Sequence, residues 1–166
     1  MRNASIQSIY QKTIAFAAEN HGQQKIPDGL PYIVHLSNVA MEVFIAHKQK
    51  PDFDLELAIQ LALLHDVLED TTLSFKQLKD VFDRVVATGV LALTKNVSLD
   101  KKDQMQDSLT RILKKDKEVA IVKLCDRITN LQKPPVKWDK EKIKIYHLQA
   151  IKIAERLKGK NEYLDK

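Results

Sequence analysis

Hydrophobic positions recur along this chain at the three-to-four-residue spacing of amphipathic helices, and strand-like alternation of polar and apolar residues is absent. Prolines and glycines gather at 22–32, and a polar segment at 96–103 reads as a second loop. The pattern predicts an all-α fold, one domain over 1–166 built as a bundle of roughly seven to nine helices. The expected helices are 5–20, 33–46, 55–70, 74–82, 84–95, 104–115, 117–131 and 139–158.

The predicted helix from Leu55 to Asp70 carries the strongest functional signal. Its first half is apolar nearly all round, which predicts a central, buried position. It then runs into His65, Asp66 and Glu69, and in a continuous helix His65 would lie over Glu69, and Asp66 over Asp70. Buried acids in such numbers are costly unless something pairs them, and a divalent cation would do so. The alternative is a helix end that is exposed to water.

Two further residues extend this candidate metal site. Asp126 borders the buried face of the helix at 117–131, although it could instead pair with Arg127 or Lys123. His35 begins the amphipathic helix at 33–46, where a lone histidine is more often structural than a ligand. The residues before it form a turn that would fix its direction.

Composition places the chain among ordinary globular proteins, with 44% hydrophobic and 30% charged residues. The longest apolar run is too short to span a bilayer, and the N-terminal segment lacks the apolar stretch of a signal peptide. The single cysteine, Cys125, excludes an internal disulfide. We therefore expect a cytoplasmic protein without a membrane partner.

The net charge of +5 comes largely from lysines in the second half of the chain. No aromatic residues interleave with them and no groove-reading motif appears, so we expect no nucleic-acid partner. The lysines read either as solvated helix surface or as charges that steer a small polyanion toward a site. The sequence leaves a homo-oligomer open.

In chain order, His35, His65-Asp66 and Asp126 match the H…HD…D pattern of the HD-domain metal-dependent phosphohydrolases, a helical superfamily. Over roughly 5–160 the chain more closely resembles the hydrolase domain of the RelA/SpoT alarmone enzymes, particularly the small stand-alone alarmone hydrolases. Three blocks carry the resemblance, and their order and spacing agree: HGQQKIPDGLPYIVHLSNVA at 21–40, ALLHDVLEDTT at 62–72 and VAIVKLCDRITNLQ at 119–132.

The resemblance implies a site and a reaction. His35, His65, Asp66 and Asp126 would hold the metal, usually manganese, although another divalent ion is also compatible. Glu69 and Asp70 would form the acidic pair needed for turnover. The reaction would remove the 3′-pyrophosphate from guanosine 3′,5′-bis(diphosphate), leaving GDP or GTP. The residues expected to contact this small nucleotide substrate are Lys25, Tyr32, Lys123, Arg127, Asn130, Lys142, Lys144 and Tyr146.

The chain departs from the family pattern near the expected base pocket. Its loop at 22–30 is short and lacks the arginine that usually stacks on guanine. Leu36 replaces a usual proline, and Thr129 stands where an aromatic residue or histidine is common. An adenosine alarmone, another 3′-phosphorylated nucleotide and NADPH therefore remain alternative substrates.

Overall fold

The computed structural model describes residues 5–132, 135 and 137–166, and in this part of the chain it contains nine helices and no strand. The all-α prediction is confirmed. The helices are α1 (Ile6–His21), α2 (Ile33–Gln49), α3 (Leu55–Leu64), α4 (Val67–Asp70), α5 (Phe75–Val81), α6 (Arg84–Leu93), α7 (Lys101–Ile112), α8 (Lys117–Gln132) and α9 (Lys140–Leu157).

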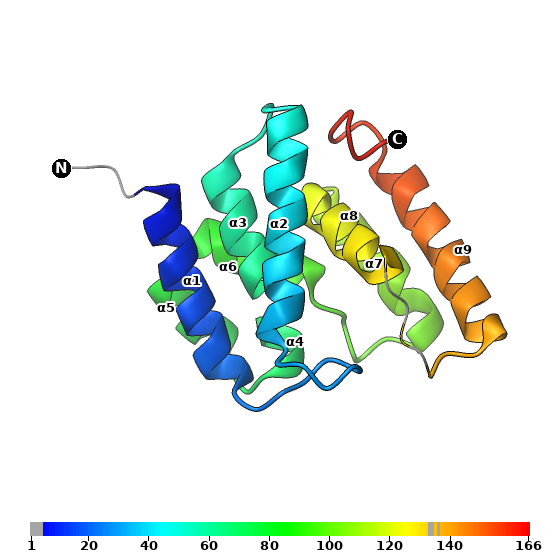
Figure 1. Cartoon of the computed structure of the whole chain (residues 1–166), viewed down its shortest axis with the longest axis horizontal. Helices are drawn as coiled ribbons and strands as arrows, with labels where there is room; N and C mark the ends of the chain where they lie inside the picture. Colours follow the sequence, from blue (N-terminus) through cyan, green and yellow to red (C-terminus); the bar gives the residue numbers. More distant parts are fainter. Residues whose placement is uncertain (1–4, 133–134, 136) are drawn as a thin grey trace.

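Helix α3 is the centre of the bundle. It packs against α1, α2, α6 and α8, as its apolar sequence predicts. Figure 1 shows α1 and α2 on one side of the molecule and α7, α8 and α9 on the other. The described part of the chain contains no helix with the length and apolar character needed to cross a bilayer.

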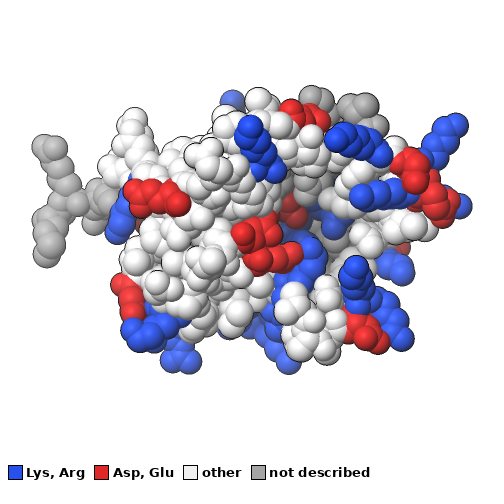
Figure 2. Space-filling view, turned by 90° about the horizontal axis from the view of Figure 1, so that it is seen from below, with Lys and Arg blue, Asp and Glu red and all other residues white. Residues whose placement is uncertain are grey.

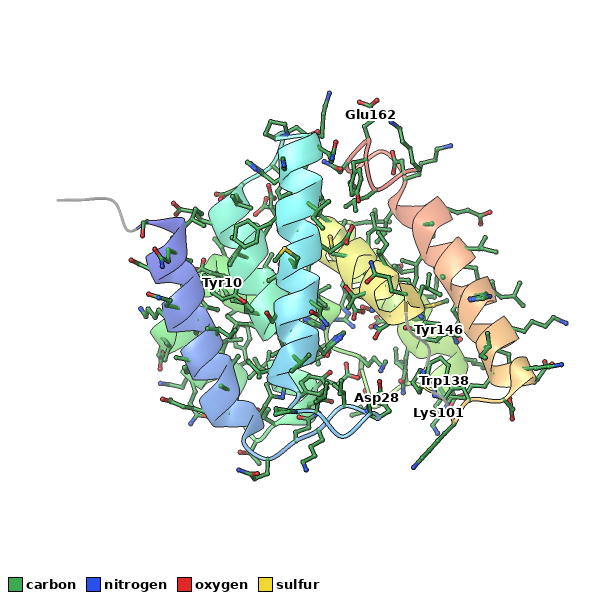
Figure 3. All side chains as sticks on the ribbon, in the orientation of Figure 1. Tyr10, Asp28, Lys101, Trp138, Tyr146 and Glu162 are labelled. Carbon is green, nitrogen blue, oxygen red and sulfur yellow. The ribbon has the colours of Figure 1, made fainter. Side chains whose placement is uncertain are left out.

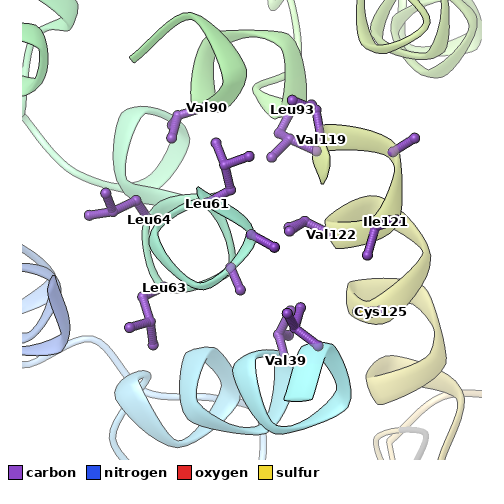
Figure 4. Packing of buried hydrophobic residues seen from close by; sticks show 14 of the residues in the cluster. Val39, Leu61, Leu63, Leu64, Val90, Leu93, Val119, Ile121, Val122 and Cys125 are labelled. Carbon is purple, nitrogen blue, oxygen red and sulfur yellow. The ribbon is translucent and has the colours of Figure 1, made fainter. Parts of the chain in front are cut away.

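The core is continuous around α3. Figure 4 looks along this helix, with Leu61, Leu63 and Leu64 pointing to different neighbours. All three leucines are fully buried, and each contributes roughly 1.5–3 kcal/mol through removal of its side chain from water. Val39 of α2 and Val122 of α8 close the core on the remaining sides. This packing fixes the end of α3 next to α2 and α8, where the candidate ligands lie.

Side-chain caps set most helix starts, as the sequence indicates. Asp54 accepts a hydrogen bond from the backbone N–H of Leu57, and Ser74, with Gln77, forms a capping box at α5. Helix α7 begins at Lys101, so the loop expected at 96–103 is shorter than predicted. The expected gap between the helices at 117–131 and 139–158 falls partly outside the described residues.

The loop at 22–32 is a compact turn that delivers Tyr32 to the start of α2. Gly22 and Gly29 adopt positive φ angles of 52° and 86°, which favour glycine. Lys25 and Pro31 form an isolated antiparallel bridge. The N–H of Tyr32 donates to the carbonyl of Gln24 at 2.9 Å. The loop is therefore held by its own backbone bonds.

Candidate metal centre and substrate cavity

The predicted helix over 55–70 is interrupted at His65 and Asp66. The prediction of one continuous helix is wrong, because α3 ends at Leu64 and α4 begins at Val67. Asp66 has φ −102° and ψ −2°, outside the regular helical range. His65 Nδ1 lies 2.7 Å from the carbonyl oxygen of Ala62. Since a carbonyl only accepts, Nδ1 carries a proton, which leaves Nε2 as the nitrogen that can bind a metal ion.

The imidazole and carboxylate groups expected to bind metal converge at this interruption. One ligand atom each from His35, His65 and Asp126 lies within 4.8 Å of the others. His35 Nε2 is 3.3 Å from Asp126 Oδ1, and His65 Nε2 is 3.7 Å from the same oxygen. Asp66 Oδ2 lies 3.0 Å from His65 Nε2 and 4.0 Å from His35 Nε2. Two helices, α2 and α8, and the turn between α3 and α4 thus place four donors together.

The protonation of these groups shows how strongly they interact. Burial lowers the pKa of the His65 imidazole, but the adjacent Asp66 and Asp126 carboxylates outweigh burial and raise that pKa to about 9. Burial raises the pKa of Asp126, but contact with His35 and the charge of Lys123 bring it to about 2. Asp66 is likewise held ionised, because His65 and Tyr32 depress its pKa against the effect of burial.

Asp126 is buried and Asp66 is partly buried, and two ionised carboxylates beside the same histidine favour a positive charge between them, so the donor set fits a divalent cation. Imidazole nitrogen with carboxylate oxygen is a ligand combination suited to transition metals such as manganese and zinc. His65 Nε2 is buried, makes no hydrogen bond among the described residues and lies 3.0 Å from Asp66 Oδ2, so a cation bound there would take the place of its proton. His35, His65 and Asp126 can therefore hold a metal ion, and Asp66 lies beside them.

Tyr32 contacts one of the candidate metal ligands, Asp66. Its hydroxyl donates a hydrogen bond of 2.5 Å to Asp66 Oδ2. Burial and the neighbouring carboxylates raise the pKa of Tyr32 far above its ordinary value, so the hydroxyl remains a donor. The ring stacks on His21, with centroids 4.8 Å apart. Tyr32 thus orients a candidate ligand, a contact that its predicted substrate role did not include.

The acidic pair lies beside the centre, and each member has a partner that the sequence did not reveal. Glu69 Oε1 accepts a hydrogen bond from Lys95 Nζ at 2.7 Å. Asp70 Oδ2 accepts one from Gln24 Nε2 at 3.0 Å. The Gln24 amide oxygen in turn lies 2.8 Å from His21 Nδ1. Both acids are held in fixed positions facing the cavity.

A cavity of about 590 Å³ opens in front of the two histidines and the acids. Figure 2 looks into this side of the molecule and shows a hollow that carries both acidic and basic side chains. In the stick view, Asp28, Trp138 and Tyr146 lie at the same end of the bundle, and all three line the cavity. The volume lies within the range of small-molecule sites in proteins.

Helix α8 supplies basic and amide groups to the cavity wall. Lys123 Nζ lies 3.7 Å from Asp126 Oδ2, and Asn130 Nδ2 donates to Asp126 Oδ1 at 2.8 Å. The Arg127 guanidinium lies 3.9 Å from the ring centroid of Tyr146. Its Nε and Nη1 atoms are buried without a hydrogen-bond partner among the described residues. Buried guanidinium donors without a partner favour an anionic ligand.

Most of the sequence-predicted residues meet at this cavity. Its lining includes both histidines, the four predicted acids, Tyr32, Lys123, Arg127, Asn130 and Tyr146. Lys25, Lys142 and Lys144 are exposed and lie outside the lining. Lys142 instead has its Nζ over the ring of Trp138, 4.7 Å from the centroid.

Sequence reasoning missed three residues at the cavity. Lys95 and Trp138 line it, and Gln24 fixes Asp70. Lys95 lies 26 positions from its partner Glu69, so no spacing rule could have connected the two. An isolated tryptophan at the start of the last predicted helix was the available signal for Trp138.

Comparison with known proteins agrees with this geometry. The model of the HD domain family matches residues 13–158. A guanosine-3′,5′-bis(diphosphate) 3′-pyrophosphohydrolase MESH1 from Danio rerio is 32% identical, with 98% of this chain and 92% of that protein covered. The guanosine-3′,5′-bis(diphosphate) 3′-pyrophosphohydrolase of Aquifex aeolicus is 34% identical, with 74% of this chain covered but only 17% of that protein.

A solved structure is also similar over nearly the whole chain. It belongs to a metazoan orthologue of SpoT that hydrolyses ppGpp, and it superimposes with a TM-score of 0.82 at 29% identity. The match covers 99% of this chain and 93% of the other. With its all-α bundle, its His-His-Asp cluster and these relatives, the chain belongs to the HD-domain family, in the group of the SpoT-type pyrophosphohydrolases.

Proposed function

We propose that this enzyme hydrolyses the 3′-pyrophosphate of guanosine 3′,5′-bis(diphosphate), releasing pyrophosphate and GDP, or GTP from the pentaphosphate. One observation carries the proposal. The metal-ligand cluster and Arg127, whose Nε and Nη1 atoms have no hydrogen-bond partner among the described residues, line one cavity, so a phosphate group there can meet both. The similarity to MESH1 over almost the entire length of both proteins supports the same reaction.

Each residue has a proposed part in the reaction. His35, His65, Asp66 and Asp126 hold the metal, for which manganese is our proposal. When bound, a divalent cation stabilises charge on the phosphoryl group and lowers the pKa of water at the site. Arg127 and Lys123 bind phosphate oxygens. Glu69 accepts the proton of the attacking water, and Asp70 supports the arrangement from the same short helix.

The remaining features complete the proposal. Residues 1–166 form one HD-type domain that acts on a small nucleotide in the cytoplasm. Asn130 and Tyr146 contact the nucleotide, because both line the cavity beside Arg127. Three further lysines can contact the substrate only if the exposed loop and helix surfaces that carry them close on it. They are Lys25, Lys142 and Lys144.

The cavity wall favours a second group of substrates as well. The loop contributes Ile26, Pro27, Asp28 and Leu30 to the lining, and no arginine is among the described lining residues of this loop. Base recognition therefore cannot use an arginine stacked on guanine from this position. An adenosine alarmone, another 3′-phosphorylated nucleotide or NADPH is the alternative substrate.

A substrate panel tests the proposal. The purified protein, supplied with manganese, is incubated separately with guanosine and adenosine alarmones, NADPH and simple nucleotides, and the products are identified by ion-exchange chromatography. Pyrophosphate from the guanosine alarmone is the expected product. If the protein releases orthophosphate from another nucleotide and no pyrophosphate from the guanosine alarmone, the proposed substrate is wrong. The proposed metal centre is not affected by that result.

A further inference from the structure

Lys95 holds both oxygens of the Glu69 carboxylate. Its Nζ donates to Oε1 at 2.7 Å, and its backbone N–H donates to Oε2 at 3.0 Å. The two residues lie on different elements, Glu69 on α4 and Lys95 just beyond the end of α6. The proposed proton acceptor therefore depends on a single partner residue for both contacts.

The backbone contact is the rigid one. Thr94, next to Lys95, closes α6 by donating its N–H to the carbonyl of Val90 at 3.0 Å. Arg111 of α7 donates to three backbone carbonyls of this segment, those of Leu91, Ala92 and Thr94. These four hydrogen bonds hold the backbone of the segment in place, so the N–H of Lys95 is a fixed donor to Glu69.

The ammonium contact is the exchangeable one. The Lys95 side chain is 57% exposed and ends a flexible four-carbon stem. Its ion pair with Glu69, in contact with solvent, favours the paired state by less than about sixfold in an equilibrium constant. A pyrophosphate group carries several charges and can compete for the same ammonium at little cost.

The other basic groups of the cavity are less free. Lys123 is 18% exposed beside Asp126, and Arg127 is stacked on Tyr146. Among the described lining residues, Lys95 is thus the basic side chain most open to an arriving anion. It is also the one whose present partner is a proposed catalytic group.

We propose that the Lys95 ammonium binds substrate phosphate, and that it leaves Glu69 Oε1 for a phosphate oxygen when the substrate enters. The backbone N–H of Lys95 stays on Oε2 and keeps Glu69 in place. Oε1 is then free to accept a proton from the attacking water, and it is free only while an anion is bound. This inference rests on the proposed function for the identity of the substrate, but the exchange itself requires only a pyrophosphate group.

Inorganic pyrophosphate is the probe that tests the exchange. Its affinity is measured by isothermal titration calorimetry with manganese-saturated protein, after subtraction of a matched titration into manganese buffer. Lys95→Met should weaken binding about tenfold, since a charge-assisted contact is lost. Glu69→Gln should tighten binding about threefold in the presence of Lys95, because the ammonium is released. That gain should vanish in the double variant Lys95→Met/Glu69→Gln.

A matched ion pair on α5 provides the control. Lys76 Nζ contacts Asp80 Oδ2 at the same distance of 2.7 Å, remote from the cavity lining. Lys76→Met should leave pyrophosphate affinity unchanged, and thermal unfolding of every variant checks the fold. If Lys95→Met binds pyrophosphate as tightly as the wild type, or Glu69→Gln gains equally without Lys95, the exchange is refuted. Failure to cleave the guanosine alarmone would refute only the proposed substrate.

Discussion

The hydroxyl of Tyr32 donates to Oδ2 of Asp66 over 2.5 Å, and this bond connects the loop at 22–32 to the interruption between α3 and α4. The same oxygen lies 3.0 Å from His65 Nε2. The residue just before α2 therefore orients a candidate ligand in the turn between α3 and α4. Such outer contacts adjust the affinity of a metal site without touching the metal.

Removing this hydroxyl should weaken metal binding. We expect Tyr32→Phe to lower manganese affinity about tenfold, because Asp66 loses the donor that fixes its carboxylate. Calorimetric titration with manganese measures the effect. Tyr10→Phe is the matched control, since the Tyr10 hydroxyl lies 3.0 Å from Ser37 Oγ and away from the cluster. Equal manganese affinity for Tyr32→Phe and wild type would contradict the orienting role.

The Gln24 contact should affect turnover rather than metal binding. Gln24→Leu removes the donor to Asp70 Oδ2, so the acid loses its fixed orientation. We expect kcat to fall about tenfold, within the range of positioning effects, while manganese affinity remains unchanged. The neighbouring Gln23 is exposed, and Gln23→Leu controls for added apolar surface. A Gln24→Leu enzyme with wild-type kcat would show that Asp70 needs no such support.

Arg127 should act mainly in substrate binding. Its Nε and Nη1 atoms have no partner among the described residues and can donate to phosphate, and a hydrogen bond to a charged group is worth roughly 1.5–3 kcal/mol. Arg127→Met should therefore raise KM about 10- to 100-fold in steady-state kinetics. Arg127→Lys should not restore it, because an ammonium lacks the planar donors that stack on Tyr146. Full rescue by lysine would assign Arg127 a purely electrostatic role.

The core around α3 should dominate the stability of the fold. Leu61→Ala removes a fully buried side chain and should lower the free energy of unfolding by about 2–5 kcal/mol in chemical denaturation. Leu91→Ala, at a site 45% exposed on α6, should cost less than about 1 kcal/mol. Similar losses for both variants would show that α3 is not the centre of the core.

The fold class and the convergence of the candidate metal ligands could be predicted from the sequence, for physical reasons. Apolar spacing reports burial directly, so the helices and the central position of α3 followed from it. His65, Asp66 and Asp126 were identified because ionisable groups on apolar helices require compensation. His35 was joined to them mainly by the resemblance to known HD-domain enzymes.

Contacts between distant segments could not be predicted in the same way. At the interruption, the His65 side chain contacts the Ala62 carbonyl, a feature that helical periodicity does not encode. The Lys95 contact to Glu69 joins two elements whose approach depends on the whole bundle. The cavity wall is the least predictable part for the same reason, since it combines the loop at 22–32 with α8 and Trp138.

Metal reconstitution coupled to product release tests the central claim most directly. Protein stripped with a chelator is titrated with manganese in the presence of guanosine 3′,5′-bis(diphosphate), and released pyrophosphate is measured for wild type and for Asp126→Asn. The wild-type enzyme should regain pyrophosphate release with manganese, whereas Asp126→Asn should remain folded and inactive at the same metal concentration. Equal activity of the stripped and reconstituted enzymes, or an active Asp126→Asn variant, would contradict a catalytic metal held by this cluster.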